Sequence, residues 1–188
     1  MLLLRILCIY FLLSNFLYAN DLLVNENKSK STIKALAINL KKSLKLILEE
    51  SGPIAAVEYC NIAALDITNE IANQKNVFIK RTSLKLRNKS NMPDNWEINV
   101  LSNFEKRKQN GENIMDLSYQ EVFKENNEAF FRYMKAIPTG QVCLTCHGSN
   151  IDSKLAYKLS ELYPDDNAYN YKIGDIRGAF SVKIPLKN

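Results

Sequence analysis

Apolar residues recur every three or four positions over residues 32–50, a spacing that predicts an amphipathic helix. Its apolar positions are Ile33, Leu36, Ala37, Leu40, Leu44, Ile47 and Leu48. We expect Gly52 to end this helix and Pro53 to begin a second one, because proline is favoured in the first turn of a helix. The second helix is predicted to run to about Gln74. Its expected buried stripe is Ala56, Cys60, Ala63, Ile67 and Ile71.

The remainder of the chain alternates between strand-like and helix-like patterns. The expected strands are 76–88, two strands within 114–137 around the turn-like 124–128, and 176–185. A helix is expected over 92–111, capped by Asp94 and closed by Gly111. Short helical pieces are expected over 143–163. Long helices followed by strands with helices between them predict an α+β fold with an antiparallel sheet, flanking helices and long N-terminal helices.

The first residues have the pattern of an export signal. Arg5 is the only charged residue before a short apolar run over 6–17, and Ala19 is a small residue at a plausible cleavage point. An uncleaved membrane anchor is the alternative, although the run is short for a full span. We therefore predict a signal peptide at 1–19, a polar lead-in at 20–31 and a single domain at 32–188. The predicted location is the periplasm.

The net charge of +5 does not indicate a nucleic-acid partner. The basic residues are scattered along the 188-residue chain, and the densest run, "FEKRKQNG", closes the expected helix at 92–111. Lysines near a helix C-terminus are favoured by the helix dipole and need no ligand. Export also removes nucleic acid as a partner.

The motif "CLTCH" at residues 143–147 predicts covalent attachment of haem. Haem c needs two thiols for its two vinyl groups and a following histidine as an iron ligand. We assign Cys143 and Cys146 to the thioethers and His147, the only histidine of the chain, to the proximal position. Gly148 is expected to relieve crowding near the ring. One motif predicts one haem c.

Two other readings of the motif fit the chain less well. A zinc site would need a fourth ligand from a second Cys or His pair, and the chain has no such pair. A thioredoxin-like redox pair would be expected after a strand within a βαβ unit, and the pattern does not provide one.

The ligand on the opposite side of the iron cannot be a second histidine. The candidates are Met92, Met115, Met134, Cys60, a lysine, a tyrosine, or an open position. Cys60 is the one cysteine left without a role, because Cys8 leaves with the signal peptide and Cys143 and Cys146 are used by haem. A spare thiol in an oxidising compartment is a liability unless it is buried or used. Cys60 could equally be a small buried apolar residue at a close helix contact.

Four stretches together resemble a known family. They are "AAVEYCNIAALDI", "KRTSLKLRNKSNMPDNWE", "RYMKAIPTGQVCLTCHG" and "YPDDNAYNYKIGDIRGAFSV", and they span nearly all of the mature chain. The chain resembles the small exported c-type haem domains with a PAS-like fold and His/Cys axial ligation, the Tll-type haem sensor domains. The resemblance implies Cys60 as the distal thiolate and His147 as the proximal ligand. Lys89 and Ala136 depart from the family pattern, which usually has proline at both positions.

Several other side chains are candidates for the surroundings of a haem. Arg81 and Arg87 could pair with the propionates, since guanidinium groups suit carboxylates, or could lie on a solvated strand face. Arg177 is expected to bond Asp175 or to join this set. Tyr169 and Tyr171 are expected either to line the pocket or to pack in the core.

The sequence leaves several functions open. A redox or small-ligand sensor would use an iron–sulfur bond that breaks on reduction and frees a site for NO or CO. A simple electron-transfer cytochrome c would keep both ligands. A haem enzyme such as a peroxidase is disfavoured, because no distal histidine base remains. A redox or signalling partner protein of unknown identity is expected, as is a homodimer through the N-terminal helices.

Overall fold

The computed structural model of the protein describes residues 2–126 and 128–186, with side chains from residue 21 onward. Four helices, α1 (Leu2–Lys75), α2 (Asn95–Gln109), α3 (Leu144–His147) and α4 (Ser153–Leu162), accompany the strands β1 (Phe78–Thr82), β2 (Ser118–Glu125), β3 (Glu128–Pro138) and β4 (Ile176–Pro185). Single turns of 3-10 helix, η1 to η3, lie at Lys89–Asn91, Ile114–Asp116 and Gln141–Cys143. The α+β prediction is confirmed.

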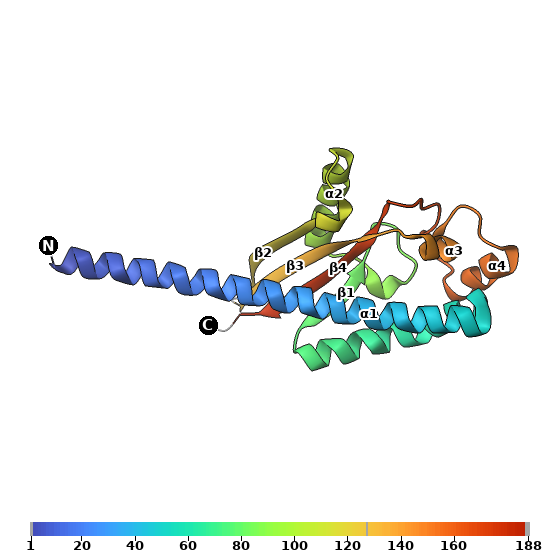
Figure 1. Ribbon diagram of the computed structural model, residues 1–188, viewed down its shortest axis with the longest axis horizontal. Coiled ribbons are helices and arrows are strands. Elements are labelled where there is room, and N and C mark those ends of the chain that lie inside the picture. Colours follow the sequence, from blue (N-terminus) through green and yellow to red (C-terminus); the bar gives the residue numbers. More distant parts are fainter. Residues whose placement is uncertain (1, 127, 187–188) are drawn as a thin grey trace.

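Helix α1 is two helices joined by a sharp kink at Gly52. The backbone of Gly52 has φ 80° and ψ −179°, a conformation that a residue with a side chain rarely adopts. Pro53 follows at once and starts the second half, as the sequence predicts. The two halves run back along each other, so that α1 forms a helical hairpin beneath the sheet (Figure 1).

The four strands form one antiparallel sheet in the order β1-β4-β3-β2. β3 and β4 occupy the centre, where residues 131 to 137 pair with residues 178 to 184. The register shifts between Ile137 and Pro138, so Arg177 lies at an irregularity in β4. β2 and β1 form the two edges of the sheet.

Alternating residues of the central strands face two separate cores. One core joins the sheet to α1 and contains Ile33, Leu36, Ile71, Val77, Ile79, Phe131, Tyr133, Val182 and Ile184. The other joins the opposite face to α2 and contains Val100, Leu101, Phe104, Leu117, Met134, Ala136, Ile176 and Ala179. This period-two alternation is what a sheet covered on both faces requires.

The start of the first helix differs from the prediction. Residues 20–31, expected as a polar lead-in, continue α1. Ser29 and Thr32 are fully buried there, and each hydroxyl donates to the carbonyl oxygen four residues earlier at 2.8 Å. Polar side chains whose hydrogen bonds are made within their own helix can be buried against a sheet. The polar composition of 20–31 does not reveal this. Residues 2–19 lie on the same helix, and their removal as a signal peptide stays a prediction.

The predicted strand at 76–88 is shorter in the structure and covers only β1. Ser83 ends it, because its hydroxyl accepts the Lys85 N–H at 3.2 Å and donates to the Arg177 carbonyl at 2.9 Å. The expected helix at 92–111 is confirmed as α2. Asp94 and Glu97 form a reciprocal capping box at its start.

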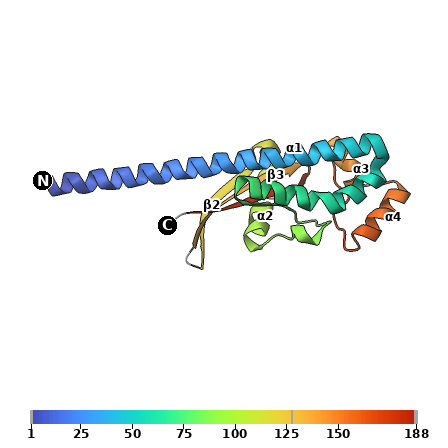
Figure 2. The same cartoon turned by 90° about the horizontal axis from the view of Figure 1, so that it is seen from below.

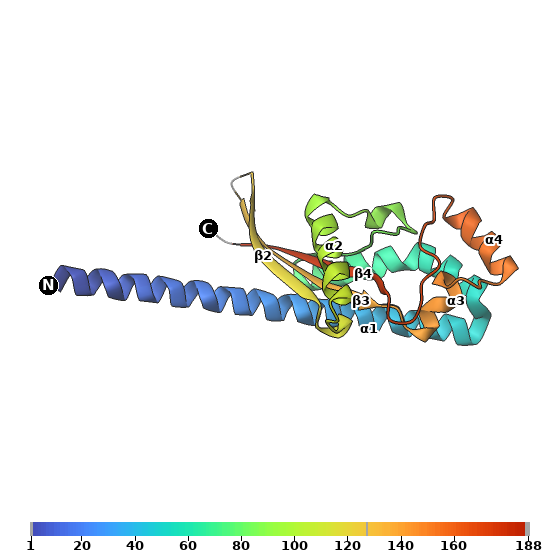
Figure 3. The same ribbon diagram turned by 90° about the horizontal axis from the view of Figure 1, so that it is seen from above.

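Helices α3 and α4 lie together at the end of the molecule where α1 reverses. Figures 2 and 3 show both beside the kink, from opposite sides of the molecule. A small third core fixes this arrangement, in which Val57 of α1 packs on Leu155 and Leu159 of α4. Residues from the second half of α1 and from 143–163 are thereby brought together.

A methyl group at Gly178 should destabilise the pairing of β1 with β4. Gly178 has φ 154°, and a Cβ there would overlap the Thr82 carbonyl oxygen. We expect Gly178→Ala to lower the free energy of unfolding by about 2–4 kcal/mol, measured by denaturant titration. Gly140→Ala is the control, since its added Cβ meets no atom within 4 Å. Equal stability of the two variants would contradict this account.

Candidate functional site

The CxxCH motif folds as two consecutive tight turns. Cys143 ends η3, while Cys146 and His147 lie in α3. Residues three apart on a helical turn share one side, so the two thiols lie on the same side of this segment. Gly148 follows with no room for a side chain, because a Cβ would lie 2.6 Å from the Leu144 carbonyl oxygen. Crowding within its own helix therefore requires this glycine, and a role in relieving crowding near a ring stays a prediction.

The imidazole of His147 is fixed by a backbone carbonyl. Its Nδ1 lies 2.6 Å from the Ala168 oxygen, and its ring meets the Tyr171 ring edge-on with centroids 6.2 Å apart. This bond assigns the proton to Nδ1 and leaves Nε2 with a free lone pair. Burial, followed by the positive charges of Arg177 and Arg87, lowers the pKa of His147 to about 2. The imidazole is therefore neutral, as a metal ligand must be.

Arg87 ties the CxxCH segment to the loop that carries Ala168. Its Nε donates to Asp166 at 2.9 Å, and its Nη2 donates to the carbonyl oxygens of Cys146 at 2.5 Å and Ala168 at 3.3 Å. Cys146 directly precedes His147, and the Ala168 carbonyl accepts the imidazole N–H, so Arg87 contacts both sides of the His147–Ala168 bond. Arg87 thus holds the orientation of the imidazole through its Nε and Nη2 donors. Its contact with a propionate stays a prediction.

Cys60 lies half-buried on α1, close to this segment. Val57, one turn earlier, belongs to the small core against which Cys146 packs. Burial raises the pKa of the Cys60 thiol, while the nearby Arg81 guanidinium acts in the opposite direction. Burial also raises the pKa of Cys146, and the Cys60 thiol adds to that effect. The structure therefore brings the three remaining thiols of the sequence into one neighbourhood.

Two further guanidinium groups face the site without a carboxylate. Among the described residues, neither Arg81 nor Arg177 forms an ion pair with an acidic side chain. Arg177 lies over the Tyr171 ring at 5.2 Å from the centroid, and its Nη1 lies 3.4 Å from the Ser83 hydroxyl. Burial lowers the pKa of both guanidinium groups. Half-buried cations without a carboxylate partner suit an anionic ligand.

The expected bond between Arg177 and Asp175 is wrong. Asp175 instead accepts the Lys108 ammonium at 2.9 Å and the Lys172 N–H at 2.8 Å. The irregularity in β4 turns Arg177 away from that turn and toward Tyr171. Tyr171 is buried beside His147, whereas Tyr169 is 45% exposed and is not part of the core.

The three methionines suggested as iron ligands lie elsewhere. Met92 and Met115 are 57% and 61% exposed, and Met134 is fully buried in the core under α2. That core is on the opposite face of the sheet from α1 and Cys60. Cys60, unlike the methionines, lies near the CxxCH segment, which the sequence alone did not show.

These side chains suit haem c as a set. Cys143 and Cys146 supply two thiols on one turn, and His147 supplies a neutral imidazole with Nε2 free. Cys60 supplies a third sulfur, and the unpaired guanidinium groups of Arg81 and Arg177 could hold two carboxylates. Sequence reasoning missed the bonds that orient the imidazole, which involve Ala168 and Asp166. Arg87 and Asp166 lie 79 residues apart, so their pairing cannot be inferred from a local pattern.

Removing the Arg87 side chain should destabilise the protein strongly. Its ion pair with Asp166 is nearly buried, with side-chain exposed fractions of 11% and 13%. We expect Arg87→Ala to reduce the free energy of unfolding by about 3–5 kcal/mol, since a buried carboxylate loses its partner. Lys89→Ala, which breaks an exposed pair with Asp165, is the control and should cost less than about 1 kcal/mol. Calorimetric unfolding of both variants checks the difference, and similar losses would refute it.

Comparisons with known proteins identify relatives of the chain. The comparison with curated proteins gives no match. The crystal structure of the cyanobacterial heme-protein Tll0287 is 25% identical in sequence with a TM-score of 0.53, over 66% of this chain and 70% of that one. The model of the Tll0287-like family matches residues 17–185. This chain belongs to the Tll0287-like family.

Proposed function

We propose that the chain is a c-type haem protein that binds one haem covalently through Cys143 and Cys146. The observation that carries the proposal is the neutral imidazole of His147, whose Nε2 is left free by the 2.6 Å contact of Nδ1 with Ala168. The relationship to a cyanobacterial heme-protein supports it. Because haem c is attached outside the bacterial cytoplasm, the proposed location is the periplasm. The only histidine is used, so no enzymatic role is proposed.

His147 and Cys60 are the proposed axial ligands of the iron. His147 would bind through Nε2, held in place by Ala168 and Arg87. Cys60 would bind as a thiolate, for which the Arg81 guanidinium supplies a positive charge nearby. Arg81 and Arg177 are the side chains left to hold the propionates. Bound haem would supply an iron that changes oxidation state.

A sensor is the form of this function that the ligand set favours. An anionic thiolate stabilises oxidised iron, whereas the neutral thioether of methionine raises the potential of electron-carrier cytochromes. The described methionines are exposed or lie in the core under α2. The sulfur that the site offers to the iron is therefore the thiolate of Cys60. A sensor would pass its signal to a separate redox or signalling protein, and NO or CO could bind at the reduced iron.

Covalent attachment is tested by mass. The purified protein should have the mass of the apoprotein plus one haem after extraction with acid and acetone, because the thioether bonds survive this treatment. The double variant Cys143→Ala/Cys146→Ala should lose the pigment to the solvent. A pigment that is extracted from the wild type would contradict the proposal.

Replacing the proposed distal ligand should change the redox potential. We expect a wild-type midpoint well below that of His/Met cytochromes and binding of CO to the reduced protein. Cys60→Met should raise the midpoint by more than about 100 mV, as expected when a neutral ligand replaces an anionic one. Met92→Leu is the control and should leave the potential unchanged, since Met92 is exposed. A high wild-type midpoint without a CO complex would instead support an electron carrier.

A further inference from the structure

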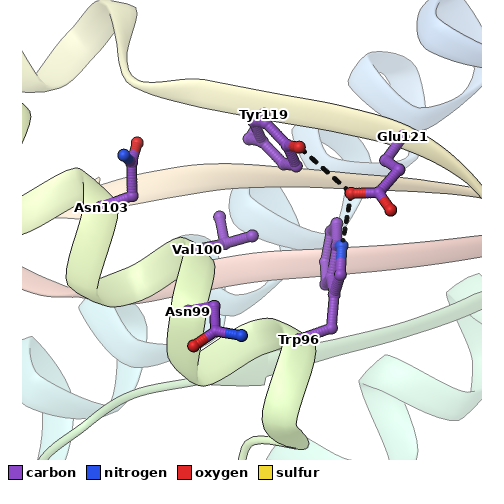
Figure 4. A pocket seen from close by; sticks show the side chains of 6 residues that line it. All are labelled: Trp96, Asn99, Val100, Asn103, Tyr119 and Glu121. Carbon is purple, nitrogen blue, oxygen red and sulfur yellow. Dashed lines mark hydrogen bonds between the residues drawn. The ribbon is translucent and has the colours of Figure 1, made fainter.

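A groove lies between α2 and the edge strand β2, remote from the site of Cys60 and His147. It encloses about 310 Å³ and is lined by Trp96, Asn99, Val100, Asn103, Tyr119 and Glu121. Figure 4 shows these side chains around one space, with those of α2 on one side and those of β2 on the other. This volume lies at the lower end of the size of small-molecule sites, roughly 300–1,000 Å³.

The aromatic wall of the groove is fixed by one carboxylate oxygen. Trp96 Nε1–H and the Tyr119 hydroxyl both donate to Oε2 of Glu121, at 3.0 and 3.1 Å (Figure 4). The ring centroids of Trp96 and Tyr119 are 5.9 Å apart. The second oxygen, Oε1, forms no hydrogen bond within the described part of the chain. The groove therefore presents a rigid aromatic pair beside a free acceptor.

Arg132 lies over the ring of Trp96. Its guanidinium lies 4.0 Å from the indole centroid and is itself paired with Asp94 at 2.8 Å and Glu97 at 3.4 Å. One face of the indole is thus covered by a paired cation.

The α2 side of the groove also offers two amide groups. Asn99 and Asn103 are exposed and lie one helical turn apart on α2, a spacing of about 5–6 Å between their Cβ atoms. Neither side chain has a hydrogen-bond partner among the described residues. Each amide supplies both donors and an acceptor. Val100, buried between them, forms an apolar floor.

We propose that this groove binds a neutral saccharide, with one pyranose ring held between α2, which carries Trp96 and the two asparagines, and the β2 residues Tyr119 and Glu121. The carboxylate of Glu121 disfavours an anion. A sugar has apolar C–H groups that stack on an aromatic face, together with hydroxyl groups that both donate and accept. It would match the amide donors and acceptors and Oε1 of Glu121 at once. This inference is independent of the proposed haem.

The test uses the intact holoprotein. Trp96 is the only tryptophan of the chain, so its indole N–H gives a single resonance that reports on this groove. Glucose, N-acetylglucosamine, and short oligomers of each are titrated by isothermal calorimetry and by ¹H–¹⁵N correlation spectra. We expect at least one of them to bind and to shift the Trp96 indole resonance.

Variants locate the binding. Asn99→Ala and Asn103→Ala should each weaken the affinity roughly three- to tenfold, the effect of one or two lost hydrogen bonds. Asn95→Ala, an exposed asparagine of the same helix outside the groove, should leave it unchanged. Matching circular dichroism spectra would show that all variants are folded. The proposal is overturned if no saccharide binds, if binding is equal in all three variants, or if tetramethylammonium shifts the indole resonance and the sugars do not.

Discussion

The reversal of α1 at Gly52 is the constraint on which the rest of the structure depends. Its φ of 80° turns the chain back on itself. The first half of α1 can then cover the sheet through Ile33 and Leu36, while the second half brings Cys60 to the CxxCH segment. A residue with a side chain would resist this conformation, and a straight helix would carry Cys60 away from His147. One glycine thus determines whether a third sulfur belongs to the site.

Positive charge dominates that site. Three guanidinium groups, those of Arg81, Arg87 and Arg177, act on His147, and only Arg87 has a carboxylate partner among the described residues. Holding unpaired cations in a partly buried site costs free energy, which an anionic group would recover on binding. Binding of haem at this site would therefore also stabilise the fold, because a ligand that binds only the folded state shifts the unfolding equilibrium.

Local patterns predicted the fold well, and contacts distant in sequence limited the prediction of the site. The helix break at Gly52 and Pro53 and the cap at Asp94 follow from residue chemistry within a few positions. The motif at Cys143, Cys146 and His147 could be identified for the same reason. The buried Ser29 and the bond between Arg87 and the Cys146 carbonyl could not, because each depends on which elements meet in space. The irregularity in β4 likewise redirected Arg177.

The two proposed sites occupy opposite edges of the sheet. Arg81 lies on the edge strand β1 and Arg177 on β4, which pairs with β1, whereas Tyr119 and Glu121 lie on β2 at the other edge. A packed sheet is not continuously deformable, so occupation of one site is not transmitted to the other merely because both contact the same sheet. α1 is different, because one continuous element carries Cys60 after its kink and packs on the sheet before it. If ligation at Cys60 changes, the α1 hairpin is the part of the fold that would carry the change to a partner.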